Sequence, residues 1–237
     1  MSGAGSEEAF RGPRAFALVL STEEGVAAVR LARRAIDGAL GPHRPDSDPA
    51  EVAANEPQPP VFDEPRGVFV TLKRYPDDAL RGCIGYPLPV LPLRTALARA
   101  AVSAAIEDYR FRPVRASDLP RLTVEVSVLS VPSPIPFTTP EEMIRAVTVG
   151  RDGLIVEGLG SSGLLLPQVA PEQGWSAEEL LDGTCEKAGL PTRAWRDSQV
   201  KVRRFEAEIF REVAPGGDVV RADPTVATAD GPPARKR

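Results

Sequence analysis

The residues best suited to chemistry lie in the pentapeptide Arg81-Gly82-Cys83-Ile84-Gly85, which follows a strand-like run. Glycine lets the backbone turn sharply or approach a ligand because it has no Cβ. A nearby guanidinium favours the thiolate, which is the reactive form of cysteine. The pattern predicts an exposed functional turn with Cys83 as a nucleophile. Packing is the competing interpretation, because a lone cysteine is more often a small buried hydrophobe and glycines near strands often mark bulges.

Other side chains could complete a thiol site. Arg81 or Arg110 could lower the pKa of the Cys83 thiol, and Glu107 or Asp108 could transfer protons. The residues predicted to be catalytic are Cys83, Arg81 and Asp108. The residues predicted to contact a substrate are the flanking glycines and three later positions, namely Gly82, Gly85, Arg110, Phe111 and Gln168.

Each of these assignments has a structural alternative. Arg110 and Asp108 could pair with each other, and Gln168 could satisfy loop amides. Phe111 fits the core better than a stacking platform. The second cysteine, Cys185, falls on the apolar stripe of a predicted helix, so we expect it in the core.

A binding module without catalysis is the second function class. The segments Arg81–Gly85 and Arg110–Pro113 would then form a pocket or docking edge for a partner protein, a peptide or a nucleotide, since amides around glycine turns can hold anions. The arginines that could bind RNA phosphates are Arg94, Arg99, Arg110, Arg112 and Arg115. The net charge of −4 and the 5% aromatic content weaken a stacking mode of RNA binding.

Composition limits the remaining classes. The chain has 237 residues, of which 42% are hydrophobic, enough for a substantial core in one or two domains. Its single histidine, His43, lies in a proline-rich stretch, which excludes a His-rich metal site and disfavours a Cys–His device. Two distant cysteines make no disulfide framework, and no run of 18 apolar residues is present. We expect a soluble cytoplasmic protein without a metal, a cofactor or a membrane partner.

A predicted hairpin positions the pentapeptide. Residues 67–74 alternate as a strand, Pro76-Asp77-Asp78 supplies a turn, and residues 80–86 form the partner strand, which places Cys83 in or beside a sheet. An alanine-rich helix over residues 93–104 should pack closely on that sheet. Residues 122–128 alternate as a half-buried strand.

The remaining pattern indicates helices and strands without regular βαβ spacing. A capping box at Ser21 and Glu24 begins a helix that ends at Gly41-Pro42, and a second box at Ser176 and Glu179 begins a helix that ends at Gly189. The predicted strands are residues 147–149, 153–158 and 199–211. These elements predict an α+β fold with a largely antiparallel sheet.

The domain organisation follows from proline and charge. Residues 1–14 and 214–237 are predicted to be disordered, and residues 42–65, which are rich in proline, to be a linker or flap. A proline-rich crossing over residues 132–136 could divide residues 15–213 into two lobes.

Several motifs in order resemble the AMMECR family, known in prokaryotes as AmmeMemoRadiSam system protein A. They are GVFVTL at Gly67–Leu72, LRGCIG at Leu80–Gly85, RF-x-P at Arg110–Pro113, VSVLS at Val126–Ser130, LLPQVA at Leu165–Ala170 and KAGLP at Lys187–Pro191. The resemblance implies two intertwined α+β lobes and an association with a Memo-like and a radical-SAM protein. It supplies no reaction. It implies that the LRGCIG cysteine, here Cys83, is a candidate for enzymatic use.

Overall fold

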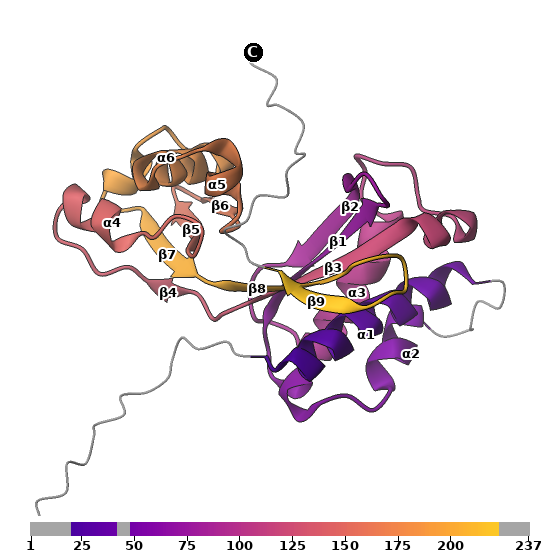
Figure 1. The fold of residues 1–237 in the computed structure, drawn as a ribbon. Helices are drawn as coiled ribbons and strands as arrows, with labels where there is room; N and C mark the ends of the chain where they lie inside the picture. The colour runs from indigo at the N-terminus through magenta and orange to yellow at the C-terminus, as the bar shows by residue number, and fades with distance from the viewer. Residues whose placement is uncertain (1–19, 42–47, 223–237) are drawn as a thin grey trace, which may run out of the picture.

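The computed structural model describes residues 20–41 and 48–222, which form two lobes (Figure 1). The larger lobe contains a five-stranded antiparallel sheet in the order β2-β1-β3-β8-β9. Its strands are β1 (Gly67–Arg74), β2 (Ala79–Tyr86), β3 (Leu122–Leu129), β8 (Ala207–Glu212) and β9 (Val219–Ala222). Its helices are α1 (Thr22–Leu40), α2 (Pro49–Asn55) and α3 (Leu93–Ile106), with 3₁₀ turns η1 (Pro60–Asp63) and η2 (Ala116–Arg121).

The smaller lobe contains a four-stranded antiparallel sheet in the order β4-β7-β5-β6. Its strands are β4 (Ser133–Pro134), β5 (Gly153–Gly158), β6 (Ser161–Leu165) and β7 (Lys201–Phe205). Its helices are α4 (Pro140–Ala146), α5 (Val169–Gln173) and α6 (Ala177–Lys187), with the 3₁₀ turn η3 (Ala194–Arg196). The predicted α+β class is confirmed. Across residues 20–41 and 48–222, no helix is both long and apolar enough to cross a bilayer.

Local sequence signals fix the helix ends as predicted. Ser21 and Glu24 form a reciprocal capping box at α1, with the Ser21 amide donating to the Glu24 carboxylate at 2.7 Å. Ser176 and Glu179 do the same at α6. Gly189 follows α6 with φ of +72°, a conformation that glycine adopts without strain.

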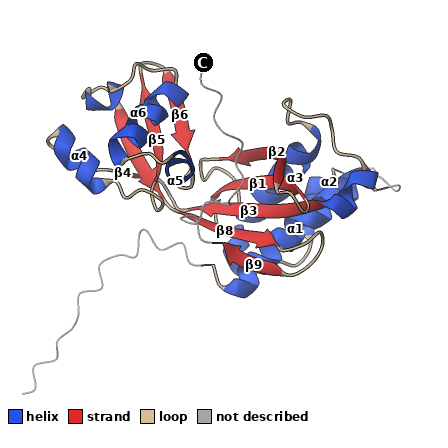
Figure 2. Ribbon diagram, turned by 45° about the horizontal axis from the view of Figure 1, so that its top comes forward, coloured by secondary structure: helices blue, strands red, loops and turns tan. Residues whose placement is uncertain are grey.

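The helices of the larger lobe cover one face of its sheet (Figure 2). Alternate residues of β1 and β3, among them Val70 and Val126, are fully buried against α1 and α3. The approach of α3 to β2 is so close that a Cβ at Gly82 would lie 2.1 Å from the Ala104 carbonyl oxygen. We call this side of the sheet the helical face. The prediction that the alanine-rich helix packs tightly on the hairpin is confirmed.

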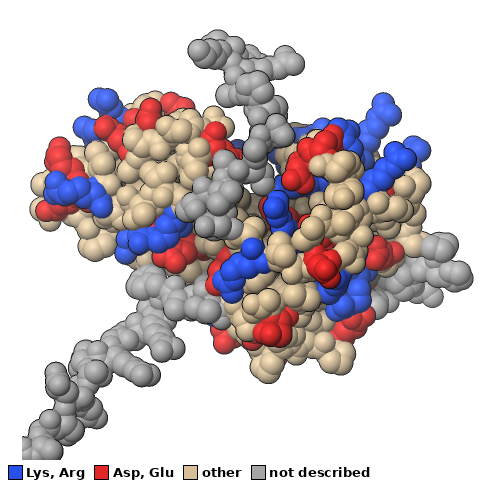
Figure 3. All heavy atoms as spheres, viewed as in Figure 1, with Lys and Arg blue, Asp and Glu red and all other residues tan. Residues whose placement is uncertain are grey.

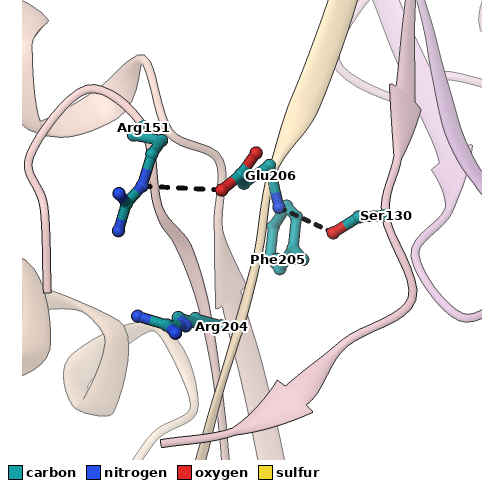
Figure 4. Close-up of a pocket in the computed structure, with 5 residues that line it drawn as sticks. All are labelled: Ser130, Arg151, Arg204, Phe205 and Glu206. Carbon is teal, nitrogen blue, oxygen red and sulfur yellow. Dashed lines mark hydrogen bonds and ion pairs between the residues drawn. The ribbon is translucent and has the colours of Figure 1, made fainter. Parts of the chain in front are cut away.

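Two chain crossings join the lobes, one of them within the predicted strand 199–211. That strand breaks at Glu206 into β7, in the smaller sheet, and β8, in the larger sheet. The other crossing follows β3, where the proline-rich segment was expected to divide the lobes. The Ser130 amide donates to the Glu206 carbonyl, and the Glu206 amide donates to the Ser130 hydroxyl, each at 2.9 Å. These bonds tie the crossings together beside a cavity of about 150 Å³, which Arg151 also lines (Figure 4).

Several predicted segments differ from the structure. Residues 81–85 lie in β2 and form a strand, not an exposed turn. Residues 147–149 form a turn closed by the Thr148 amide on the Asp152 carboxylate at 2.8 Å. The described part of segment 42–65 contains α2 and η1, which pack on the larger lobe. β9 lies within the predicted tail 214–237 and pairs with β8. Segment 1–14 lies outside the described residues.

Candidate functional site

Chemically capable side chains line up on the second face of the five-stranded sheet, opposite the helical face. Strand register places Cys83 of β2 opposite Thr71 of β1, Thr71 opposite Glu125 of β3, and Glu125 opposite Arg211 of β8. Residues directly opposite each other point to the same side of a sheet. We call this side the polar face, defined by Thr71, Lys73, Cys83, Thr123, Glu125 and Ser127.

The Cys83 thiol is half-buried on the polar face, and the Thr71 hydroxyl donates a hydrogen bond to its sulfur at 3.3 Å. Burial raises the pKa of Cys83 above its ordinary value, because it penalises the thiolate. The Thr71 hydrogen bond and the charge of Arg110 lower this pKa, and Glu125 and Asp108 raise it. The resting group is therefore the neutral thiol, and not the arginine-activated thiolate that the sequence suggested.

Asp108 and Arg110 form a clamp on the outer edge of β2, which we call the edge clamp. The Asp108 carboxylate accepts the backbone amide of Cys83 at 2.8 Å, and the Arg110 guanidinium donates to the Cys83 carbonyl at 3.2 Å. The same two side chains pair with each other at 2.7 Å. They satisfy the backbone groups that an edge strand otherwise leaves unpaired.

The edge clamp holds its carboxylate in the charged form. Asp108 is 5% exposed, and its pKa falls to about 2 because of its hydrogen bonds with Arg110 and despite its burial. A carboxylate with that pKa is a weak proton acceptor near neutral pH. The geometry favours Asp108 as a positioning residue for Cys83 over a proton-transfer group.

An ion pair lies next to Thr71 on the polar face. The Lys73 ammonium contacts the Glu125 carboxylate at 2.9 Å, and both side chains are largely buried. Both charges also act on Glu172 of α5 in the smaller lobe. The pKa of Glu172 is raised, mainly because the carboxyl group is partly desolvated; the charge of Lys73 lowers this pKa and that of Glu125 raises it. The two lobes meet on this side of the sheet, where Phe69 of β1 shares an apolar cluster with Leu164 and Leu166 of the smaller lobe.

Gln168 precedes Glu172 by one helical turn and shares its side of α5, since the Glu172 amide donates to the Gln168 carbonyl at 3.1 Å. The Gln168 Oε1 atom is buried and accepts no hydrogen bond from any described residue. An unpaired amide oxygen on this side of α5 suits the predicted role of Gln168 as a hydrogen-bonding group for a polar ligand.

The other predicted residues lie at the margins of this site. Arg81 directs its guanidinium to the Pro113 carbonyl at 3.4 Å, away from the polar face. Gly85 lies beneath the Phe69 ring, and a Cβ there would be 2.3 Å from the Val68 carbonyl oxygen. Gly82 packs on α3 in the same way, so close packing leaves no room for a larger side chain at either glycine. Phe111 is half-buried, and the Cζ atom of Arg110 lies 5.4 Å from the centroid of the Phe111 ring. The catalytic and binding roles of all these residues remain predictions.

Four residues on or near this face were not predicted from the sequence, namely Thr71, Lys73, Glu125 and Glu172. The sequence contains two signals for Thr71, Lys73 and Glu125. Polar residues alternate with valine and leucine in β1, and a glutamate lies in the middle of β3. The alternation was interpreted as one solvent-facing side. Glu125 is in fact 9% exposed, because β3 is buried on both faces. Cys185 is fully buried in the smaller lobe, which confirms its predicted place in the core.

Comparison with known proteins identifies the family. The family model AMMECR1 matches residues 29–210. A protein of Thermococcus gammatolerans is 53% identical over 85% of this chain and 97% of its own length. Protein PF1979 of Pyrococcus furiosus is 49% identical over 85% of this chain and 94% of its own length. The crystal structure of uncharacterised protein PH0010 from Pyrococcus horikoshii superimposes with a TM-score of 0.76 at 48% identity, covering 85% of this chain and 97% of that one. The chain therefore belongs to the AMMECR1 family.

Proposed function

We propose that the polar face at Cys83 is a thiol-dependent enzyme site or modification platform. The observation that carries the proposal is the row formed by Cys83, Thr71 and Glu125, in which a hydroxyl bonded to the sulfur stands between the thiol and a carboxylate. A buried ion pair such as Lys73–Glu125 is often no more stabilising than apolar side chains of the same volume, so folding alone gives little reason for these polar residues. Gln168, whose buried side-chain oxygen accepts no hydrogen bond from a described residue, is a second group that we assign to the substrate.

The chemistry begins from a neutral thiol. To form a bond to an electrophilic substrate, the sulfur must lose its proton, and the carboxylate that lies on the same side of the sheet is Glu125, whose charge raises the pKa of Cys83. The Lys73 ammonium would balance the negative charge that the transfer leaves behind.

Alkylation of the folded protein by iodoacetamide tests the accessibility of this thiol. The labelling rate of Cys83 is measured against pH by peptide mass spectrometry, with the buried Cys185 as an internal control. We expect Cys83 to be labelled well before Cys185, with a midpoint above the free-thiol value of roughly 8.5. If both cysteines are labelled only on unfolding, Cys83 is a structural residue and the proposal is wrong.

A binding module is the second candidate, and the raised pKa of Cys83 favours it, because a neutral thiol is a weak nucleophile. The ligand would be held by Gln168 and the edge clamp, and the Memo-like and radical-SAM proteins implied by the family resemblance are the partners to examine. Co-elution of purified proteins on a sizing column separates the candidates. If Arg110→Ala loses a partner that Cys83→Ser retains, binding is the function. If neither variant changes capture, the partner site lies elsewhere.

A further inference from the structure

A hollow of about 460 Å³ lies at the edge of the larger lobe, beside β2 and the segment that leads from α3 to η2. Its lining contains three arginines, one carboxylate and one proline, namely Arg81, Arg112, Arg115, Asp118 and Pro113. Figure 3 shows Lys and Arg side chains projecting from this end of the larger lobe. None of the five residues belongs to the polar face, so the hollow is distinct from the Cys83 site.

A register shift directs Arg81 into the hollow. Leu72 pairs with Gly82 but Lys73 pairs with Leu80, so Arg81 is the extra residue of a β-bulge. A bulge changes the direction of a side chain on an edge strand. The Arg81 guanidinium consequently reaches the Pro113 carbonyl at 3.4 Å and stands 4.0 Å from the Asp118 carboxylate.

The charges in the hollow are incompletely paired. The Nη1 atom of Arg81 is buried and donates to no described residue. Arg112 and Arg115 are exposed, and within residues 20–41 and 48–222 neither has a carboxylate within ion-pair distance. Asp118 is partly engaged, because it accepts the Arg115 backbone amide at 2.9 Å. Three guanidinium groups against one carboxylate leave the hollow with an excess of two positive charges.

The structure separates this group from the other arginines that the sequence marked for RNA. Arg94 pairs with Asp63 at 2.7 Å, and Arg110 is held in the edge clamp. Arg112 and Arg115 instead converge with Arg81 on one hollow. No aromatic side chain lines it, so it offers no surface on which a nucleic-acid base could stack. Its volume falls within the range of small-molecule sites.

We propose that the hollow is a binding site for the phosphate group of a small molecule. Guanidinium groups bind phosphate through paired, charge-assisted hydrogen bonds, and the unpaired Nη1 of Arg81 supplies a buried donor at the base of the site. Arg112 and Arg115 close on the group from the exposed side. The site does not depend on any chemistry at Cys83.

Calorimetric titration with inorganic phosphate and pyrophosphate, at constant ionic strength, tests the proposal. The test variant is the double substitution Arg112→Gln/Arg115→Gln, whose side chains are exposed and so do not threaten the fold. The control is Arg145→Gln/Arg193→Gln, which removes the same charge from exposed positions of the smaller lobe. We expect wild type and control to bind alike and the test variant to bind about tenfold more weakly, since each charged hydrogen bond contributes on this scale.

Three results would overturn the site. They are equal binding by all three proteins, equal weakening in test variant and control, and no detectable binding by wild type. Binding of a fluorescent single-stranded RNA distinguishes the hollow from an RNA-binding surface. If the RNA binds through Arg112 and Arg115 and pyrophosphate does not displace it, this surface binds RNA and the proposal of a small-molecule site is wrong. Cys83→Ser should bind phosphate as wild type does, which separates this outcome from failure of the thiol proposal.

Discussion

The two faces of the five-stranded sheet are built from alternate residues of the same strands, yet they differ in chemistry. The helical face carries Val68, Val70 and Leu72 from β1, which pack against α1 and α3. Its one buried ion pair among the described residues joins Glu212 of β8 to Arg33 of α1. The polar face carries Thr71 and Lys73 from that strand and is also largely covered. The helical face supplies the apolar burial that stabilises the lobe. Across β1, β2 and β3, the groups that are costly to bury gather on the polar face, and this difference is the reason that we propose it as the site.

The comparison is sharpest at β2, where adjacent residues face opposite sides. Gly82→Ala would place a methyl group 2.1 Å from the Ala104 carbonyl oxygen on the helical face, so α3 or β2 must move. We expect a loss of about 3 kcal/mol in the free energy of unfolding, at the upper end for overpacking. Cys83→Ala, on the polar face, should cost about 1 kcal/mol. Urea denaturation of both variants measures the difference.

Equal losses of stability in the two variants would contradict this difference between the two faces. They would show that the Cys83 side chain packs as tightly as the α3 contact, and that the polar face contributes to stability as the helical face does.

Strands β1, β2 and β3 of the larger lobe were predictable because their signals are local. The alternation in β1 and β3 and the turn at Pro76-Asp77-Asp78 are contained in short windows of sequence. The break at Glu206 was not predicted, although the apolar positions change phase between Val202 and Phe205, because residues 199–211 were interpreted as one strand. The break depends on the partner strands, because β7 pairs with β5 in one sheet while β8 pairs with β3 in the other.

The site was predictable only in part, for a similar reason. The motif around Cys83 directed attention to the right strand, and the pairing of Asp108 with Arg110 was weighed as a structural alternative. The row from Cys83 to Glu125 exists only through the register of three strands, in which Thr71 of β1 lies opposite Cys83 of β2 on one side and Glu125 of β3 on the other. No sequence window contains these residues together, so no local pattern could place them.

The edge clamp predicts a pH-dependent contribution to stability. The pKa of Asp108 is about 2 in the folded protein and 3.8 ordinarily, so the folded state favours the ionised form. The contribution is present in full above pH 4 and is lost as the pH falls from about 4 to 2. We expect Asp108→Asn to lose about 2 kcal/mol at pH 7, with the difference from wild type vanishing near pH 2. Urea denaturation across this range measures it.

A difference that persists undiminished at pH 2 would contradict the assignment, because it would then come from packing and not from charge. Asp118→Asn is a matched control: Asp118 also accepts a backbone amide, but its side chain is 42% exposed. Its substitution should cost less than about 1 kcal/mol at any pH.

The ion pair on the polar face gives a smaller effect on stability and a clearer effect on the thiol. Glu125→Gln leaves the largely buried Lys73 without its carboxylate, and we expect a loss of about 1 kcal/mol, since the pair is not fully removed from water. The same change removes a negative charge that raises the pKa of Cys83. Iodoacetamide labelling of Cys83 at fixed pH should therefore become faster. Slower or unchanged labelling would mean that Glu125 does not act on the sulfur.

The smallest effect on stability should come from Thr71→Val, which keeps the shape of the side chain and removes the donor to Cys83 Sγ. We expect a change of less than about 1 kcal/mol. The hydrogen bond favours the thiolate, so its loss should raise the pKa of Cys83 and slow labelling at fixed pH. Thr123→Val is the matched control, because it removes a hydroxyl from the same face that bonds to the Lys73 carbonyl and not to the sulfur. Slower labelling in Thr71→Val alone would show a polar face arranged around the thiol, whereas equal labelling in both variants would make Thr71 an ordinary strand residue.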